Sequence, residues 1–256
     1  MHAPAEAAAE HVRIAVDDGV QTVRLNRPEK KNAITGPMYA AMARALREAD
    51  GRGDVAATVF LGSPGAFSAG NDMNDFLRYA TSGELGHEVL DFLDALARAD
   101  HALVSAVDGL AIGVGMTLHL HCDATFATPR SRFQTPFVDL ALVPEAASSL
   151  LLPRAVGHQR AFAVLAAGHS MGAEDAQSAG LILGVVDEDR LEDTALAYAR
   201  DLAAKPQGAL RIARRLLRPD PDAVAARIAE EARHFAAQLR SDEARAAFQA
   251  FMTRKR

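Results

Sequence analysis

The sequence predicts an α/β core followed by a purely helical C-terminal region. Up to about residue 190, short apolar segments typical of buried strands alternate with helical segments, and this alternation predicts parallel, buried sheets. From residue 191 onward the pattern is helical and carries no strand signal. We therefore expect a disordered tail over residues 1–10, the α/β core over 11–190 and a helical region over 191–256.

The first elements follow from alternation and from turn residues. Residues 11–26 alternate apolar and polar side chains on both sides of Asp18-Gly19, which predicts a β-hairpin. After a short loop, Thr35 can cap a helix that ends near Gly51.

The remaining elements are apolar runs between helix breakers. Three runs are short enough for buried strands: 55–61, 103–107 and 124–128. Two further segments of the core read as helical: 74–99, interrupted around 82–84, and 115–121. Proline and serine divide the C-terminal region into four helices: 191–204, 206–217, 221–239 and 242–251.

Composition excludes several classes of protein. A net charge of −5 argues against a general nucleic-acid binder. No apolar run reaches the ~18 residues of a membrane span, and the first ten residues lack the basic segment of a signal peptide. The one cysteine, Cys122, is expected to be a small core residue, and it cannot form a disulfide within one chain. These features predict a cytoplasmic protein with no nucleic-acid or membrane partner.

The spacing of residues excludes a dinucleotide-binding loop and a metal site that two motifs superficially suggest. Gly109, Gly113 and Gly115 are spaced G-x-x-x-G-x-G, which differs from the dinucleotide-binding pattern. His119 and His121 lie two residues apart and so point to different faces of a helix, which favours structural roles and predicts no metal site.

The pair Ser148-Ser149 does not indicate a hydrolase, because the pattern around it is not that of a nucleophile elbow. We expect these serines to satisfy backbone groups near the start of a helix.

Two small-residue turns and one carboxylate are the most informative features. The turns are 67–72 (Phe-Ser-Ala-Gly-Asn-Asp) and 108–115, and each follows an apolar strand. Free backbone N–H groups at such turns can hold an oxyanion. With Glu145 as a base, they suggest enolate chemistry on an activated acyl compound. The alternative for Glu145 is an acid in the first turn of a helix after Pro144, stabilised by the helix dipole.

Four segments in this order resemble the crotonase (enoyl-CoA hydratase/isomerase) superfamily. They are 26–33 (Asn-Arg-Pro-Glu-Lys-Lys-Asn-Ala), 67–72, 109–115 and 144–146, and the resemblance covers about residues 11–256. It implies a crotonase-like spiral of ββα turns with a helical C-terminal trimerisation region. It also implies an acyl-CoA thioester substrate, no cofactor beyond the coenzyme A of that substrate, and a homotrimer or hexamer.

The resemblance assigns roles to the two turns. The thioester oxygen would be held by the backbone N–H groups of Asn71, which follows Ala69 and Gly70, and of Val114, which follows Gly113.

Coenzyme A contacts are implied at both ends of the chain. Lys30 and Lys31 lie in the loop that passes the phosphates in this family, with a solvated basic pair as the alternative. Phe251 and Arg254 match residues that contact coenzyme A, often from a neighbouring subunit.

Two departures point to one subgroup. Hydratases of this family handle water with two glutamates, and Thr117 and Phe137 stand at those positions here. Glu145 instead occupies the position of the base in Δ3-Δ2-enoyl-CoA isomerases. A single carboxylate can take the C2 proton and return it at C4, and an apolar pocket would raise its pKa.

Other readings stay open. An enoyl-CoA hydratase and a non-catalytic acyl-CoA-binding protein are the alternatives. Hydrolysis or decarboxylation of a thioester on the same scaffold also stays possible. The neighbouring acids Asp72 and Asp139 are expected to be structural.

Overall fold

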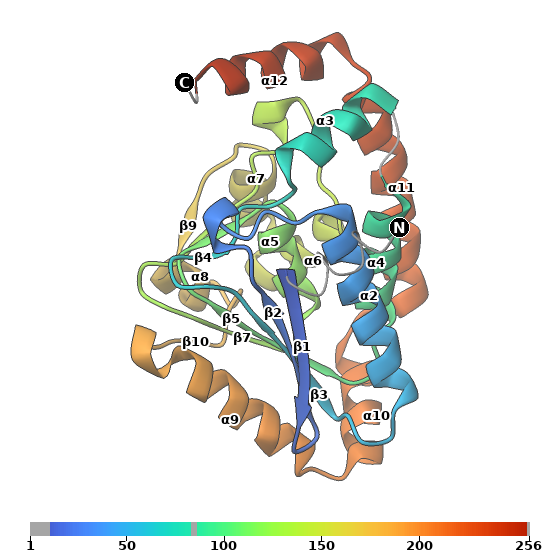
Figure 1. The fold of residues 1–256 in the computed structure, drawn as a ribbon, viewed down its shortest axis with the longest axis vertical. Helices are drawn as coiled ribbons and strands as arrows, with labels where there is room; N and C mark the ends of the chain where they lie inside the picture. Colours follow the sequence, from blue (N-terminus) through green and yellow to red (C-terminus); the bar gives the residue numbers. More distant parts are fainter. Residues whose placement is uncertain (1–10, 83–85, 255–256) are drawn as a thin grey trace.

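The computed structural model describes residues 11–82 and 86–254, and its centre is a six-stranded sheet in the order β1-β2-β3-β5-β7-β10 (Figure 1). The strands are β1 (Val12–Asp17), β2 (Val20–Leu25), β3 (Ala57–Leu61), β5 (Ala102–Val107), β7 (Ala124–Ala127) and β10 (Gly184–Val185). The predicted hairpin β1–β2 is antiparallel and every other pair is parallel. The predicted parallel α/β core is therefore confirmed. The expected tail over residues 1–10 lies outside the described residues.

A second, smaller sheet was missed by the sequence analysis. It has the order β4-β6-β8-β9, with β4 (Ala66–Ser68), β6 (Leu110–Ile112), β8 (Arg132–Gln134) and β9 (Met171–Gly172). Strands of two or three residues are too short to show a periodic pattern. This sheet matters for function because β4 and β6 are parallel neighbours that lead into the two small-residue turns.

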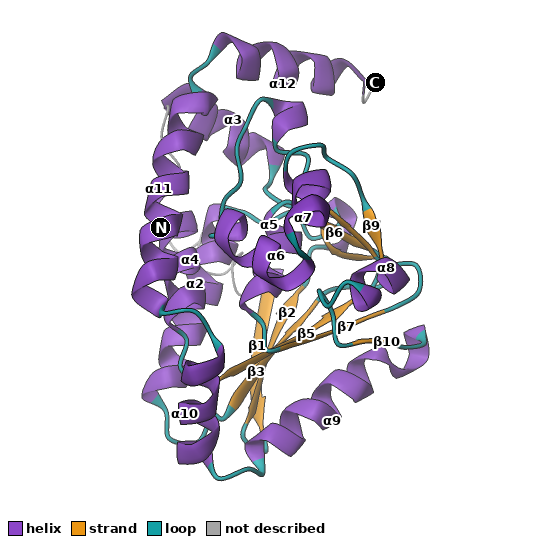
Figure 2. Cartoon of the chain, turned by 180° about the vertical axis from the view of Figure 1, so that it is seen from behind, coloured by secondary structure: helices purple, strands orange, loops and turns teal. Residues whose placement is uncertain are grey.

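Helices cover both faces of the large sheet (Figure 2). On one face lie α2 (Gly36–Gly51) and α4 (His87–Arg98), which pack on each other. The other face is covered by α9 (Leu191–Ala203), whose apolar residues form a separate core with β2, β3, β5 and β7. The shorter elements of the core are 3₁₀ turns and helices: Pro28–Lys30, α3 (Met73–Ser82), α5 (Val114–Thr117), Leu118–His121, Val138–Leu140, α6 (Ser148–Val156), α7 (His158–Leu165), α8 (Ala173–Ser178) and Glu188–Arg190.

The C-terminal region is helical, as predicted, with α9 followed by α10 (Gln207–Leu217), α11 (Pro221–Leu239) and α12 (Asp242–Arg254). In Figure 1, α11 runs beside α4, and α12 crosses the top of the molecule near α3. Phe76 of α3 joins these helices, since its ring centroid lies 6.1 Å from that of Phe235 and 5.2 Å from that of Phe248. The expected role of this region in oligomerisation stays a prediction.

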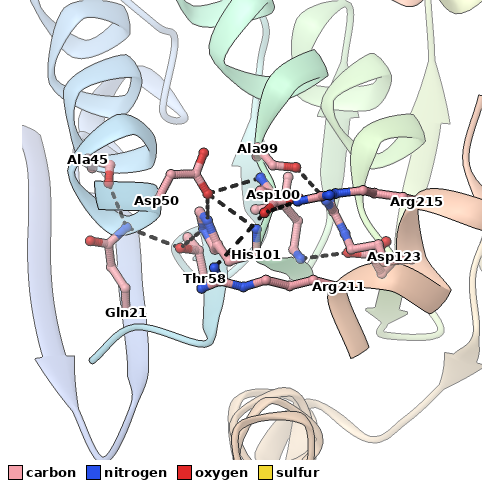
Figure 3. A network of polar contacts seen from close by, with 12 residues as sticks. Gln21, Ala45, Asp50, Thr58, Ala99, Asp100, His101, Asp123, Arg211 and Arg215 are labelled. Carbon is pink, nitrogen blue, oxygen red and sulfur yellow. Dashed lines mark hydrogen bonds and ion pairs between the residues drawn. The ribbon is translucent and has the colours of Figure 1, made fainter. Parts of the chain in front are cut away.

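A buried polar network ties α10 to the strands (Figure 3). Arg214 is 7% exposed, and its Nε lies 2.7 Å from Asp123 Oδ2 while Nη1 donates to the Ala99 carbonyl. Beside it, His101 Nδ1 lies 2.6 Å from Asp50 Oδ1. The helical region is thus fixed to the core by specific polar contacts as well as by packing.

Two local predictions needed correction. Thr35 precedes α2, but its side chain makes no capping bond; the Gly36 N–H donates to Asp75 Oδ2 at 2.9 Å instead. The helix expected over 115–121 begins at Val114 and tightens into a 3₁₀ turn at Leu118. Its early start matters because it makes Val114 the first residue of α5.

Within residues 11–82 and 86–254, every helix is too short or too polar to cross a membrane.

Candidate active site

The two small-residue turns lie against each other at the ends of β4 and β6. A Cβ atom added to Gly70 would stand 3.0 Å from the Ile112 carbonyl oxygen, and one on Gly115 would stand 2.8 Å from the Ser68 Cβ. Gly70 and Gly113 also have positive φ angles, +87° and +56°. Only glycine accommodates both the backbone conformation and the close approach. The glycines therefore let the two turns meet.

The first turn leaves one backbone amide without an acceptor. The Gly70 N–H donates to Ser68 Oγ at 3.1 Å, and the Asp72 N–H donates to the Ile34 carbonyl at 2.8 Å. Between them, the Asn71 N–H has no hydrogen-bond partner among the described residues. It is available to a ligand oxygen.

The second turn repeats this arrangement. The Gly113 N–H donates to the Gln134 carbonyl at 2.9 Å, and the Met116 N–H donates to the Gly113 carbonyl at 2.8 Å. The Val114 N–H, at the start of α5, has no acceptor in the part of the chain that is described. Two unpaired amides on adjacent turns are the donor set that an oxyanion requires.

Tyr39, which the sequence analysis did not single out, supports the first turn. It lies in α2 with 1% of its surface exposed, and its hydroxyl donates to Asn71 Oδ1 at 2.6 Å. Burial raises its pKa well above the usual value, and the nearby charge of Glu145 raises it further. The phenol therefore stays protonated. In the sequence, Tyr39 lies on an apolar face of the predicted helix, and such a position indicates packing in the core and nothing about a site.

Glu145 is buried, with 7% of its surface exposed. Burial raises its pKa to about 7, although the Thr117 hydroxyl lowers it by donating to Oε1 at 2.5 Å; the charge of Glu231 raises it. Glu145 lies three residues before α6, so the alternative of an acid in the first helical turn is wrong. A carboxyl group that titrates near neutral pH is suited to accept and return a proton.

Glu145 and Asn71 line the same narrow cavity, whose other walls come largely from α4 and α11. The other lining residues are apolar: Val89, Leu90, Leu93, Ala146, Ile228, Ala232 and Phe235. Glu145 and Asn71 thus border a common apolar space.

The serines at the start of α6 behave differently from the prediction. The Ser149 hydroxyl donates to Glu231, and the buried Ser148 hydroxyl has no partner among the described residues. The backbone N–H groups of Ala147 and Ser149 are bound by Glu231 from α11. No motif marked this glutamate, because the contact joins segments more than 80 residues apart.

Of the residues expected to bind coenzyme A, the structure describes the side chains of the two lysines but not those of Phe251 and Arg254. The Lys31 carbonyl accepts from the Ala69 N–H at 2.9 Å, which puts the basic loop beside the first turn. The side chains of Lys30 and Lys31 are exposed, without an ion-pair partner in the described chain. Phe251 and Arg254 lie in the last turn of α12, and their side chains are outside what is described.

Phe137 does not line the cavity that holds Glu145. It is 6% exposed and packs in the main core, so its contact with substrate stays a prediction.

The expected structural role of Asp72 agrees with its contacts: Oδ2 lies 2.7 Å from Arg27 Nη1, and Oδ1 accepts from the Asn74 N–H.

The two histidines serve the core around the site. His119 Nδ1 lies 2.9 Å from Ser105 Oγ, and His121 Nε2 lies 2.8 Å from the Ala146 carbonyl. Burial lowers their pKa values to about 3 and about 4, so both are neutral at pH 7.

Burial raises the pKa of Cys122 to about 12, which agrees with its reading as a core residue. The described residues include no group of three candidate metal ligands.

Comparisons with known proteins show which family the chain and its fold are similar to. The family described as enoyl-CoA hydratase/isomerase matches residues 15–256. The 1,2-epoxyphenylacetyl-CoA isomerase of Escherichia coli (strain K12) is 35% identical over 197 residues, covering 75% of each protein. Enoyl-CoA delta isomerase 2 of Rattus norvegicus is 32% identical over 254 residues, which cover 95% of this chain and 64% of that protein. The crystal structure of an enoyl-CoA hydratase/isomerase from Pseudoalteromonas atlantica T6c, 36% identical, superposes with a TM-score of 0.90 and covers 95% of this chain and 97% of that one.

Proposed function

This chain belongs to the enoyl-CoA hydratase/isomerase family, and from that premise we propose that it moves the double bond of a 3-enoyl-CoA to the 2-position. One observation carries the proposal: Glu145, the carboxylate that lines the narrow cavity, has a pKa raised by burial to about 7 and shares that cavity with Asn71. The backbone N–H groups of Asn71 and of Val114, on the adjacent turn, have no partner among the described residues.

The proposed reaction needs only one acid/base group. The Glu145 carboxylate takes a proton from C2 of the 3-enoyl thioester, and the electron pair moves onto the thioester oxygen. The amides of Asn71 and Val114 stabilise that oxyanion, and each donor of this kind is worth about 3 kcal/mol in the transition state. Collapse of the dienolate forms the C2–C3 double bond while the protonated Glu145 returns the proton at C4. No atom is gained or lost.

The contacts of Glu145 favour isomerisation over hydration. Hydration adds a water molecule and is served in this family by two carboxylates, whereas Thr117 places a hydroxyl group beside Glu145. A hydroxyl group cannot act as an acid or base at neutral pH in the way a carboxyl group can. The name of the rat relative, a delta isomerase, supports the same choice.

Coenzyme A binding is part of the proposal. The exposed Lys30 and Lys31, beside the first turn, would meet the phosphates, and Phe251 and Arg254 would reach coenzyme A in a homotrimer or hexamer. The only cofactor chemistry involved is the thioester of the substrate itself. A cytoplasmic location is proposed with it.

Two parallel assays test this function. The protein is given a 3-enoyl-CoA, and the absorbance of the conjugated thioester is followed, while a 2-enoyl-CoA is tested for hydration. Isomerisation without hydration supports the proposal. Hydration without isomerisation would make the protein a hydratase, and binding of CoA esters with neither activity would indicate a non-catalytic member of the family.

A further inference from the structure

The segment that carries Glu145 has an unfavourable backbone. Ala146 and Ala147 both adopt the left-handed conformation, with φ angles of 59° and 55°. This conformation is unfavourable for residues other than glycine, because Cβ comes too close to the following carbonyl oxygen. Two such residues in succession persist only where surrounding contacts hold them.

Glu231, in the middle of α11, supplies the contacts on one side. It is 6% exposed. Its Oε2 accepts from the Ala147 N–H at 2.6 Å, and its Oε1 accepts from the Ser149 N–H at 3.0 Å and from the Ser149 hydroxyl. One carboxylate therefore spans the turn between Glu145 and α6.

Two neutral groups hold the other side of the same turn. The His121 side chain binds the Ala146 carbonyl at 2.8 Å, and the Thr117 hydroxyl donates to Glu145. Both come from the segment that follows the second small-residue turn. From the C-terminal region, Glu231 binds the backbone N–H groups of this segment, whereas Arg227 reaches only the Ser149 hydroxyl.

An ion pair does not explain the burial of Glu231. Arg227, one turn earlier on α11, pairs with Glu230 at 3.1 Å and donates to Ser149 Oγ at 3.1 Å. Among the described residues Glu231 has no ion pair of its own. A buried carboxylate without a paired cation is costly unless its hydrogen bonds compensate, and here all of them go to the turn.

We propose that Glu231 is a positioning residue, which holds the left-handed turn so that the Glu145 carboxylate faces the cavity shared with Asn71. The proposal rests on the function proposed above, because it assigns Glu231 to the support of that base. It makes α11 a necessary part of the active site rather than only a cover over it.

The two carboxylates also interact electrostatically. The negative charge of Glu231 adds to burial in raising the pKa of Glu145. Burial also raises the pKa of Glu231 itself, and its hydrogen bonds to Ser149 and Ala147 and the charge of Arg227 oppose that rise. The other groups that face Glu145 are the protonated Tyr39 phenol and the Thr117 hydroxyl, and His121 behind the turn is neutral. Removal of the Glu231 charge should therefore lower the pKa of Glu145, whereas a change confined to packing should not.

The test compares three variants. Glu231→Gln removes the charge and sets an amide NH₂ against a backbone N–H. Glu231→Asp keeps the charge but is one methylene too short to span both amides. Glu230→Gln is the control, because it removes one exposed carboxylate from the same helix that makes no direct contact with the turn; its partner Arg227 keeps a donor for Ser149 Oγ. Each is assayed for isomerisation across pH, and circular dichroism checks its folding.

Displacement of a catalytic group by about 1 Å can cost about 100-fold in rate, so kcat should fall by about that factor in both Glu231 variants, with KM unchanged. The acid limb of the pH profile should move to lower pH in Glu231→Gln and stay in place in Glu231→Asp. Wild-type kcat and profile in both would overturn the proposal, as would an equal loss in the control. If Glu231→Gln does not fold, Glu231→Asp decides alone through its kcat and KM.

A second readout separates this proposal from the proposed function. The carbon-13 resonance of the Glu145 carboxyl group, assigned with Glu145→Gln, reports its pKa without any substrate. If the wild-type protein does not isomerise but Glu231→Gln lowers that pKa, the function fails and the coupling of the two glutamates stands. If the protein isomerises and Glu231→Gln leaves both kcat and that pKa unchanged, the positioning role fails and the function stands.

Discussion

Two regions of the molecule bury polar side chains in opposite ways. Beneath α10, two buried side chains are each matched with a carboxylate that is not itself buried: the Nε of Arg214 pairs with Asp123. The ring of His101 lies against Asp50 (Figure 3). Although burial alone would raise the pKa of Asp50, the hydrogen bond and charge of His101 bring it below the usual value. This network favours the ionised carboxylate.

The candidate active site has the opposite effect on its carboxyl group and disfavours the ionised form. Glu145 is buried in an apolar cavity with one hydroxyl donor, and the charge that acts on it is that of another carboxylate, Glu231. Its pKa rises instead of falling. The first region uses burial to fix the fold, while the second keeps an unfavourable charge where the proposed reaction moves a proton.

The largest expected effect is that of Glu145→Gln on activity. General acid–base groups contribute about 10²–10⁴-fold to rate, so kcat for isomerisation should fall by about 1,000-fold. Binding of a CoA ester, measured by calorimetry, should be nearly unchanged because the amides of Asn71 and Val114 remain. Equal activity in the variant would remove Glu145 from the mechanism.

A substitution in the network beneath α10 should lower the free energy of unfolding and leave kcat unchanged. Arg214→Met removes a buried guanidinium that binds Asp123 Oδ2 and the Ala99 carbonyl, and a hydrogen bond to a charged group contributes about 1.5–3 kcal/mol. Urea unfolding should show a loss of about 2 kcal/mol while kcat of the folded fraction stays the same. A stable variant with impaired kcat would erase the contrast between the two regions.

The two regions should give pH dependences of opposite sign. Because the pKa of Glu145 is raised from 4.5 to about 7, the folded state holds an extra proton between these values, and stability falls as pH rises through them. Wild type should lose about 3 kcal/mol relative to Glu145→Gln over this window. Asp50 has a lowered pKa, so its contribution is present at neutral pH and is lost as pH falls below 3.8.

Urea unfolding of wild type, Glu145→Gln and Asp50→Asn at several pH values measures both trends. The same sign for Glu145 and Asp50 would contradict the comparison.

A smaller effect is expected at Tyr39. Tyr39→Phe removes the hydroxyl that donates to Asn71 Oδ1 but keeps the ring against Phe92. A neutral hydrogen bond contributes about 1 kcal/mol, which corresponds to a loss of less than about tenfold in kcat. Steady-state kinetics with a 3-enoyl-CoA would measure it, and an unchanged kcat would show that the first turn holds its shape without this contact.

The sequence predicted the large elements well, because hairpins, long helices and buried strands carry periodic patterns. The strands β4, β6 and β8 did not emerge, since three residues show no period. At the site, glycine-rich turns and the position of Glu145 were visible as motifs. Tyr39 and Glu231 were not, because an isolated polar residue in a helix looks the same whether it faces solvent or supports a distant turn.

Exchange of the C2 protons of a saturated acyl-CoA in D₂O tests the central claim most directly, because such a ligand can form an enolate but can neither isomerise nor be hydrated. With butanoyl-CoA, the account predicts that wild type incorporates deuterium at C2, as measured by mass spectrometry, and that Glu145→Gln does not. Equal incorporation by both proteins, or none by wild type, would contradict the claim that Glu145 and the two free amides generate an enolate.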